Sequence, residues 1–141
     1  MKEDNTTELT QLGSNSTDYT YDNPSAEILE CFENQNQKRD YVINFDFPEF
    51  TSLCPKTGQP DFASFKVEYI PKEKCLESKS VKLYFFSYRN NGNFMETITN
   101  QVLSDMVEVC DPKWMKVTGD FNARGGLVIK VVAEHRSCLP I

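Results

Sequence analysis

Apolar side chains alternate with polar ones in four separate stretches of this chain, and the residues between the second and third stretches follow a helical period instead. The alternating stretches lie at residues 41–47, 65–69, 114–121 and 127–133. A period of two predicts strands, whereas apolar residues three and four apart predict amphipathic helices. Such helices are expected at residues 81–88 and 94–109. The predicted fold is therefore α+β, in the order β-β-α-α-β-β, with an antiparallel sheet.

The polar and acidic first 20 residues contrast with the rest of the chain, and they are expected to form a mobile N-terminal tail over residues 1–20. Residues 21–141 are then a single domain, of a size that builds a core without cross-links. A short helix is expected at residues 25–32, with Ser25 near its N-terminus. No apolar run approaches the ~20 residues of a membrane span, so no membrane partner is expected.

The net charge and the cysteine spacing exclude several classes of protein. The net charge of −6 opposes binding to nucleic acid backbones, so no direct nucleic acid partner is expected. Residues 56–89 carry a net charge of +3, which suits a small phosphorylated ligand, although charge alone favours an ordinary solvated face. The five cysteines include no Cys-x-x-Cys pair, so neither a zinc ribbon nor a small disulfide scaffold fits. We expect reduced thiols, no metal site and a cytoplasmic location.

Cys54 and Asp61 are the first candidates for chemistry. Both lie in the polar loop expected at residues 51–61, where a hairpin could bring the thiol and the carboxyl together. A thiolate attacks electrophilic carbon, and a neighbouring acid can supply protons to the adduct. To raise the thiolate fraction, Lys56 or a cation of a neighbouring chain would be needed. Spacing alone favours a buried thiol and a turn-capping aspartate.

A second set of candidates lies where the expected helices begin. Residues 77–82 combine the N–H groups of a helix start with Lys79 and Lys82, which suits an anion site and equally suits a capped helix with surface lysines. Glu96, in the first turn of the second helix, either interacts with the helix dipole or holds the N–H edge of a purine-like ring. The chain has no Gly-x-Gly-x-x-Gly motif or Walker loop, so a Rossmann or P-loop nucleotide site is not expected.

Two segments together strongly resemble one enzyme family. Residues 49–63, EFTSLCPKTGQPDFA, and residues 77–84, ESKSVKLY, are similar to the NADPH-dependent 7-cyano-7-deazaguanine reductases. These are the nitrile reductases of queuosine biosynthesis, here in the short single-module form, and the resemblance covers roughly residues 22–130. It implies the tunnelling fold shared with GTP cyclohydrolase I. Subunits of that fold associate into barrels, and their active sites lie between subunits, so a homo-oligomer is expected.

The resemblance also implies roles for individual residues. Cys54 would add to the nitrile carbon of a small deazapurine substrate and form a covalent thioimide, with Asp61 as the proton donor. Two molecules of NADPH would then give 7-aminomethyl-7-deazaguanine. By matching position, the substrate site would be lined by Leu76, Glu77, Ser78, Met95 and Glu96. The segment 77–84 is the NADPH-associated signature, which makes Lys79 and Lys82 the candidates for the cofactor's phosphates.

The sequence departs from this family at three places. Met95 stands where the family usually has a histidine, and methionine neither titrates nor donates a strong hydrogen bond. Ile98 stands where many relatives have a cysteine that pairs reversibly with the nucleophile, so that disulfide is not expected. The chain also ends soon after the last expected strand. Two alternatives stay open: a deazapurine-binding protein that is catalytically weakened or dead, and an enzyme that forms the thioimide but transfers it to an amine.

Overall fold

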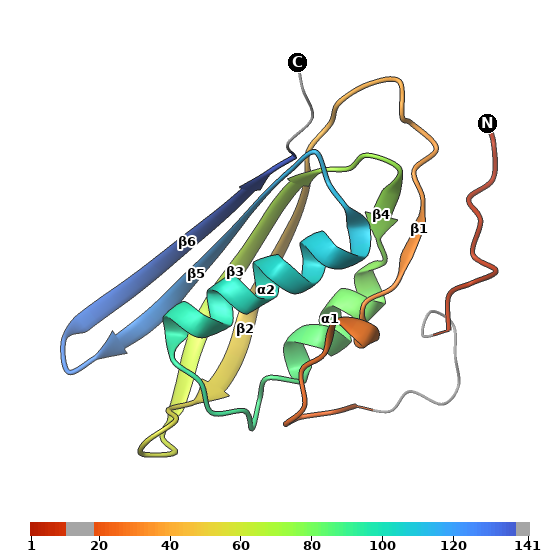
Figure 1. Ribbon diagram of the computed structural model, residues 1–141. Coiled ribbons are helices and arrows are strands. Elements are labelled where there is room, and N and C mark those ends of the chain that lie inside the picture. The colour runs from red at the N-terminus through yellow and green to blue at the C-terminus, as the bar shows by residue number, and fades with distance from the viewer. Residues whose placement is uncertain (11–18, 138–141) are drawn as a thin grey trace.

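A computed structural model describes residues 1–10 and 19–137 of the protein, and its main feature is a four-stranded sheet with both helices on one face (Figure 1). The spatial order of the strands is β2-β3-β5-β6, and every neighbouring pair is antiparallel. These strands are β2 (Ile43–Leu53), β3 (Pro60–Ile70), β5 (Trp114–Arg124) and β6 (Leu127–Arg136). The helices α1 (Ser78–Phe86) and α2 (Met95–Cys110) connect β3 to β5 through the short strand β4. The predicted α+β class and the β-β-α-α-β-β core are confirmed.

The first hairpin is longer than the sequence pattern predicted. β2 was expected to end at Phe47 but continues to Leu53, which shortens the connecting loop to residues 54–59. A register shift between Phe47 and Phe50 explains the difference. Pro48 and Glu49 together lie opposite Ser64, and this one extra residue in β2 breaks the period-two alternation on which the prediction rested.

Two short strands form a second sheet that the sequence pattern did not predict. β1 (Cys31–Glu33) pairs with β4 (Lys74–Leu76), with Cys31 opposite Leu76. The helix expected at residues 25–32 is wrong in extent, because only a single 3-10 turn (Ala26–Ile28) forms before the chain extends into β1. Ser25 does cap this turn, since its side chain accepts a hydrogen bond from the Glu27 N–H at 3.2 Å. Strands of three residues are too short to produce a periodic signal.

The expected N-terminal tail lies partly outside the described residues, which exclude residues 11–18 and 138–141. Before that gap, the Thr10 N–H donates to both carboxylate oxygens of Glu30, at 3.1 and 3.0 Å. After it, the Tyr19 ring packs edge-on against Phe86 of α1, with 5.5 Å between centroids.

In the part of the chain that the structure describes, no helix is both long enough and apolar enough to span a bilayer.

Aromatic rings fill the space between the sheet and the helices. Phe50 and Phe65 lie 4.5 Å apart, and Phe65 also contacts Phe85 of α1 and Phe121 of β5. Each of these four side chains is at most 2% exposed. Aromatic rings at these distances attract one another, and this attraction stabilises the core in addition to the burial of apolar surface. This cluster therefore fixes α1 against the part of the sheet next to the β2–β3 loop.

A buried polar network joins the two helices. The Tyr84 hydroxyl of α1 donates to Asp105 Oδ2 of α2 at 2.6 Å and shares a 2.8 Å hydrogen bond with the Tyr88 hydroxyl. The Gln101 side-chain amide donates to Asp105 Oδ1 at 2.7 Å. Because both carboxylate oxygens accept a hydrogen bond, the buried Asp105 side chain is satisfied only while the two helices keep this spacing. The network holds α1 and α2 in one relative position.

Glycine at position 119 lets α2 lie close to β5. A Cβ atom placed there would be 2.7 Å from Thr99 Oγ1 of α2 and 2.9 Å from the Phe121 ring. Thr99 is itself fixed, because its hydroxyl donates to the Met95 carbonyl at 2.9 Å. The close approach sets the distance between the first turn of α2 and the sheet.

Replacing Gly119 by alanine should lower the free energy of unfolding by about 1–3 kcal/mol, because the added methyl group overpacks the interface between α2 and β5. Urea unfolding followed by circular dichroism measures the change. The matched control is Thr118→Ala, since that side chain lies on the opposite face of β5. Equal unfolding midpoints for Gly119→Ala and the unchanged protein would contradict this packing.

Candidate active site

Cys54 lies immediately after β2, at the start of a tight six-residue loop. Its N–H donates to the Gln59 carbonyl at 2.8 Å, and its carbonyl accepts from the Gly58 N–H at 2.9 Å. Both backbone groups of the cysteine are therefore bonded within the loop. The thiol is half-buried, and none of the four described cysteines forms a disulfide. The loop presents a free thiol from a fixed backbone.

The strand register places Asp61 near this thiol. Ser52 pairs directly with Asp61 across the hairpin, and Cys54 follows Ser52 by two residues. Side chains two residues apart point to the same face of an extended chain, and diagonal neighbours on that face are within reach of each other. This face is the one covered by the helices, where Ser52 is 0% and Asp61 is 4% exposed. If Cys54, the first residue after β2, continues this alternation, its thiol lies toward the same face as Asp61.

Hydrogen bonds lower the pKa of Cys54 to about 7. The largest cause is a hydrogen bond from the Thr57 hydroxyl, followed by the backbone N–H groups of Thr57 and Lys56. Partial burial acts in the opposite direction, and the Arg124 side chain adds a smaller lowering contribution. The sequence had pointed to a cation such as Lys56. The structure uses the Lys56 backbone instead, because the loop turns its N–H toward the sulfur.

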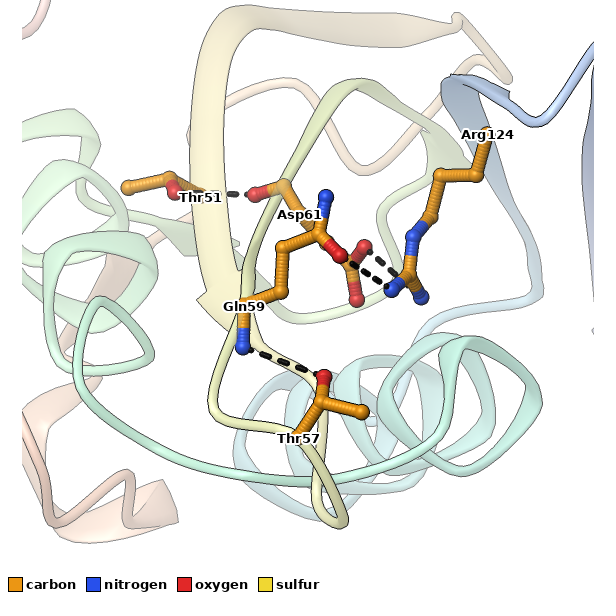
Figure 2. A network of polar contacts seen from close by, with 5 residues as sticks. All are labelled: Thr51, Thr57, Gln59, Asp61 and Arg124. Atoms are coloured by element: carbon orange, nitrogen blue, oxygen red, sulfur yellow. Dashed lines mark hydrogen bonds and ion pairs between the residues drawn. The ribbon is translucent and has the colours of Figure 1, made fainter.

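Arg124, near the end of β5, forms an ion pair with the buried Asp61 (Figure 2). Its Nη1 atom lies 3.3 Å from Asp61 Oδ1, and its Nη2 atom donates to Gln59 Oε1 at 3.0 Å. Thr51 Oγ1 donates to the Asp61 backbone carbonyl at 2.8 Å. Apart from this ion pair, Asp61 Oδ1 has no hydrogen-bond partner among the described residues, and the buried Ser52 Oγ atom has none either. Sequence reasoning assigned no role to Arg124, because its contact with Asp61 spans two strands and 63 positions.

The link between the helices runs beside the cysteine loop. The Leu53 N–H donates to the Asn91 carbonyl at 3.0 Å, and Leu53 forms a parallel bridge with Gly92. Consequently α2 begins at the same end of the sheet as the β2–β3 loop (Figure 1). Glu96 is exposed on the first turn of this helix, whereas Met95 is only 8% exposed and packs in the core. Glu96 is therefore on the surface at this end of the sheet, whereas Met95 is in the core.

The other predicted substrate residues lie elsewhere in the chain. Leu76, Glu77 and Ser78 line a pocket that they share with Phe32, Ile43 and Phe45. Phe45 precedes Leu53 by eight residues along β2, which corresponds to about 25 Å at ~3.3 Å per residue. Within one chain, therefore, the structure does not bring these three residues to Cys54.

The Glu77 carboxylate caps α1. It accepts from the N–H groups of Lys79 and Ser80 at 2.7 and 2.8 Å, and its side chain is buried. The sequence left an anion site and a capped helix start equally open for these N–H groups, and the hydrogen bonds from Lys79 and Ser80 to Glu77 show the cap. The lysines themselves lie on one helical face, three residues apart. Lys82 is exposed, with its ammonium 5.9 Å above the Tyr19 ring.

The donor set of these lysines fits a dinucleotide phosphate. Each ammonium group offers three N–H donors and a positive charge, which phosphate oxygens accept. Lys79 is half-buried and Lys82 is exposed, so a ligand can approach this helical face.

Among the described residues, no group of three or more His, Cys, Asp or Glu side chains is arranged to hold a metal ion.

Comparison with known proteins identifies the family. Residues 60–138 match the family described as QueF-like protein. A protein of Magnetococcus marinus is 52% identical over 112 residues, which cover 79% of this chain and 88% of that protein. One of Halorhodospira halophila is 56% identical over 110 residues, covering 78% and 93%. Both are named NADPH-dependent 7-cyano-7-deazaguanine reductase. The chain belongs to this reductase family.

A solved structure supports the reductase fold. The crystal structure of the archaeosine synthase QueF-Like in the apo form superposes with a TM-score of 0.63 at 26% sequence identity. The match covers 70% of this chain and 96% of that one. This likeness agrees with the predicted α+β fold, in which the sheet of this chain is antiparallel.

Replacing Thr57 by valine should raise the pKa of Cys54 from about 7 toward the value of about 8.5 for an unperturbed thiol. The reason is that the largest hydrogen bond to the sulfur is lost while the backbone N–H groups remain. The rate of alkylation of Cys54 by iodoacetamide as a function of pH, followed by mass spectrometry, measures this shift. Thr118→Val serves as the control and should leave the midpoint unchanged. A midpoint that stays near 7 in Thr57→Val would refute the assignment.

Proposed function

We propose that this protein reduces the nitrile of 7-cyano-7-deazaguanine to 7-aminomethyl-7-deazaguanine, using NADPH, in the cytoplasmic pathway to queuosine in tRNA. The observation that carries the proposal is a thiol of lowered pKa, Cys54, on the same face as the buried carboxyl of Asp61. The family to which the chain belongs is named for this reaction. Neither a thiol nor a carboxyl alone reduces a nitrile, so the cofactor is part of the proposal.

Covalent catalysis begins at Cys54. The thiolate attacks the nitrile carbon, a carbon–sulfur bond forms, and one π bond of the C≡N group breaks. Its electron pair goes to nitrogen, which takes a proton from the Asp61 carboxyl. The product of this step is a neutral thioimide, C(=NH)–S, attached to Cys54. The atoms balance because the proton that leaves the Cys54 thiol is replaced by the one delivered to nitrogen.

The thioimide accepts a hydride more readily than the nitrile, because its nitrogen can be protonated. NADPH, when bound, would supply the hydrides, and two molecules would provide the four electrons of the reduction. Between the two reductions the carbon–sulfur bond breaks, and its electron pair returns to sulfur as the Cys54 thiolate. Lys79 and Lys82 on α1 are proposed to hold the phosphates, by charge and by N–H donors. Asp61 is proposed to deliver the protons, and its burial keeps competing water away from the adduct.

Glu96 is proposed to anchor the deazaguanine ring. Its carboxylate is exposed at the first turn of α2, at the end of the sheet where Cys54 lies. A carboxylate accepts two hydrogen bonds side by side, which matches the N–H and amino donors along one edge of the base. Met95, in place of the family's usual histidine, supplies no further polar contact, since it packs in the core.

The complete site is proposed to form between two copies of the chain. One copy would supply Cys54, Asp61 and Glu96, and its neighbour the pocket at residues 76–78, which adjoins Phe45 in the first half of β2. The outer strands β2 and β6 leave the sheet with two open edges, and β6 exposes Leu127, Val128 and Val132 at more than half of their surface. Edges of this kind are commonly covered by strand pairing. We infer a homo-oligomeric barrel with sites at its interfaces.

Adding 7-cyano-7-deazaguanine should cause NADPH oxidation, measured by absorbance at the nicotinamide band, with amine product measured by mass spectrometry. Cys54→Ala should reduce the rate by at least about a thousandfold, because the attacking atom is lost. Cys31→Ala, at another half-buried thiol, is the matched control and should retain activity.

The same assay separates the alternatives. Turnover by Cys54→Ala would contradict covalent catalysis. Tight binding of the nitrile without NADPH oxidation or adduct would indicate a binding protein, and Met95→His would then test whether the missing histidine is the cause. Product that requires ammonia and forms without NADPH would indicate amine transfer.

Mixing two inactive variants should restore activity if the site is shared between copies. Cys54→Ala removes the nucleophile from one half-site, and Ser78→Trp blocks the pocket of the other. After joint refolding in equal amounts, about one quarter of the sites receive both intact halves in a symmetric assembly. NADPH oxidation near that fraction of the normal rate is expected. Activity no higher than that of the separate variants would place both halves in one chain.

A further inference from the structure

Two tyrosine rings lie side by side next to the C-terminal end of α1. The Tyr19 ring packs edge-on against Phe86, with 5.5 Å between centroids, and the Tyr21 carbonyl accepts a hydrogen bond from the Asn90 N–H just beyond the helix. The two tyrosine rings are nearly parallel, with 8° between their planes and 6.2 Å between their centroids. Residues 19–21 therefore run beside α1 and present a pair of parallel rings there (Figure 1).

Both rings stay open to solvent. Tyr19 is 41% and Tyr21 is 39% exposed, whereas Phe85, which holds the same helix on the sheet, is 2% exposed. A ring that served only to anchor residues 19–21 would be expected to bury more of its apolar surface. Exposed aromatic rings are the surfaces on which proteins stack the flat bases of nucleotides.

Positive charge lies beside each of the two rings. The Lys82 ammonium is 5.9 Å from the Tyr19 centroid, and the Arg89 guanidinium carbon is 5.9 Å from the Tyr21 centroid. Both basic side chains belong to exposed residues. Lys82, Phe86 and Arg89 are four and three residues apart, a spacing that places them on one side of α1 and of the turn that continues it. Flat rings and cations are therefore gathered on one surface.

We propose that Tyr19 and Tyr21 bind the adenine ring of NADPH, and that Lys82 and Arg89 hold the phosphates next to that ring. This inference rests on the proposed function, which makes NADPH the cofactor and places its phosphates on α1. A nucleotide joins a flat base to its phosphates through a single sugar, so a base stacked on the tyrosines brings negative charge to the neighbouring cations. The tyrosines would add recognition of the base to the recognition of phosphate.

The adenine half is assigned because the nicotinamide has to reach the adduct on Cys54. Hydride transfer requires the nicotinamide ring to lie against the reacting carbon, whereas the adenine ring takes no part in the chemistry. The tyrosines adjoin the α1–α2 link, since Asn90 bonds to Tyr21. The next residue of the link, Asn91, accepts from the Leu53 N–H beside Cys54 at 3.0 Å. The two rings thus adjoin the end of the sheet that carries the thiol without being part of the cysteine loop.

The cations that lie over the rings do not prevent stacking of a base. A cation held over an aromatic ring at an exposed position is weakly bound. Phosphate oxygens form stronger, charge-assisted hydrogen bonds with ammonium and guanidinium groups. The phosphates would therefore draw Lys82 and Arg89 off the tyrosine rings, which leaves the ring faces to the adenine.

The test measures binding, with no substrate present and no turnover. Titration calorimetry gives the Kd of NADPH and of adenosine 2′,5′-bisphosphate, which has the adenine and two phosphates but no nicotinamide. The double variant Tyr19→Leu with Tyr21→Leu should weaken both ligands by about tenfold or more, because stacking on the base is lost while apolar side chains remain beside Phe86. The double variant Tyr19→Phe with Tyr21→Phe keeps both rings and should bind both ligands as the unchanged protein does.

Phe62→Leu is the matched control, because Phe62 is 55% exposed on β3 and lies on the face of the sheet away from the helices. It should leave both Kd values unchanged. Circular dichroism of each variant establishes that it folds. If the double leucine variant does not fold, Tyr21→Leu alone, which leaves the contact between Tyr19 and Phe86 in place, decides the question in the same way.

Three results would overturn the proposal. They are unchanged Kd values in the leucine variant, equal weakening in the leucine and phenylalanine variants, and weaker binding of NADPH with normal binding of adenosine 2′,5′-bisphosphate. The last result would place the nicotinamide half on the tyrosines. Binding that depends on the two rings in a protein that fails the reductase assay would refute the proposed function and leave this inference standing. Normal turnover together with ring-independent binding would overturn this inference alone.

Discussion

The antiparallel pairing of β2 with β3 is the constraint on which the site depends. From Ile43 opposite Tyr69 to Leu53 opposite Pro60, the two strands are paired along the hairpin, and Ser52 is fixed opposite Asp61. A shift of this register by one residue would turn Asp61 to the other face of the sheet and away from Cys54. Phe50 and Phe65, buried on the same face, oppose such a shift, because it would expose both rings. The core that stabilises the fold also sets the geometry of the reacting pair.

The hairpin also underlies the proposal that one chain holds only part of the site. Its turn carries Cys54, while the pocket at residues 76–78 adjoins the opposite part of β2. α1 begins at this pocket and runs toward the end of the sheet that carries the β2–β3 loop, so the pocket and the loop lie toward opposite ends of α1 (Figure 1). Under that proposal, a second copy supplies the other half. The open edges of β2 and β6 offer a surface for it.

The sequence predicted those parts of the fold whose signals are local and periodic. Both helices and the strand pairs β2–β3 and β5–β6 follow from apolar spacing, apart from the bulge at Pro48 and Glu49. Strands β1 and β4 were missed because three residues carry no period. Cys54 and Asp61 could be named because one sequence motif contains both, although Asp61 lies in β3 and not in the loop. Arg124 could not be assigned, because its role depends on a pairing between β3 and β5 and on a register shift.

The covalent adduct at Cys54 is the most direct test of the account. The protein would be incubated with 7-cyano-7-deazaguanine in the absence of NADPH and measured as an intact chain by mass spectrometry under mild denaturing conditions. We predict a gain equal to the whole mass of the nitrile, because addition expels no group, with the modification on the peptide that contains Cys54. Absence of that gain in the unchanged protein, or the same gain in Cys54→Ala, would contradict the account.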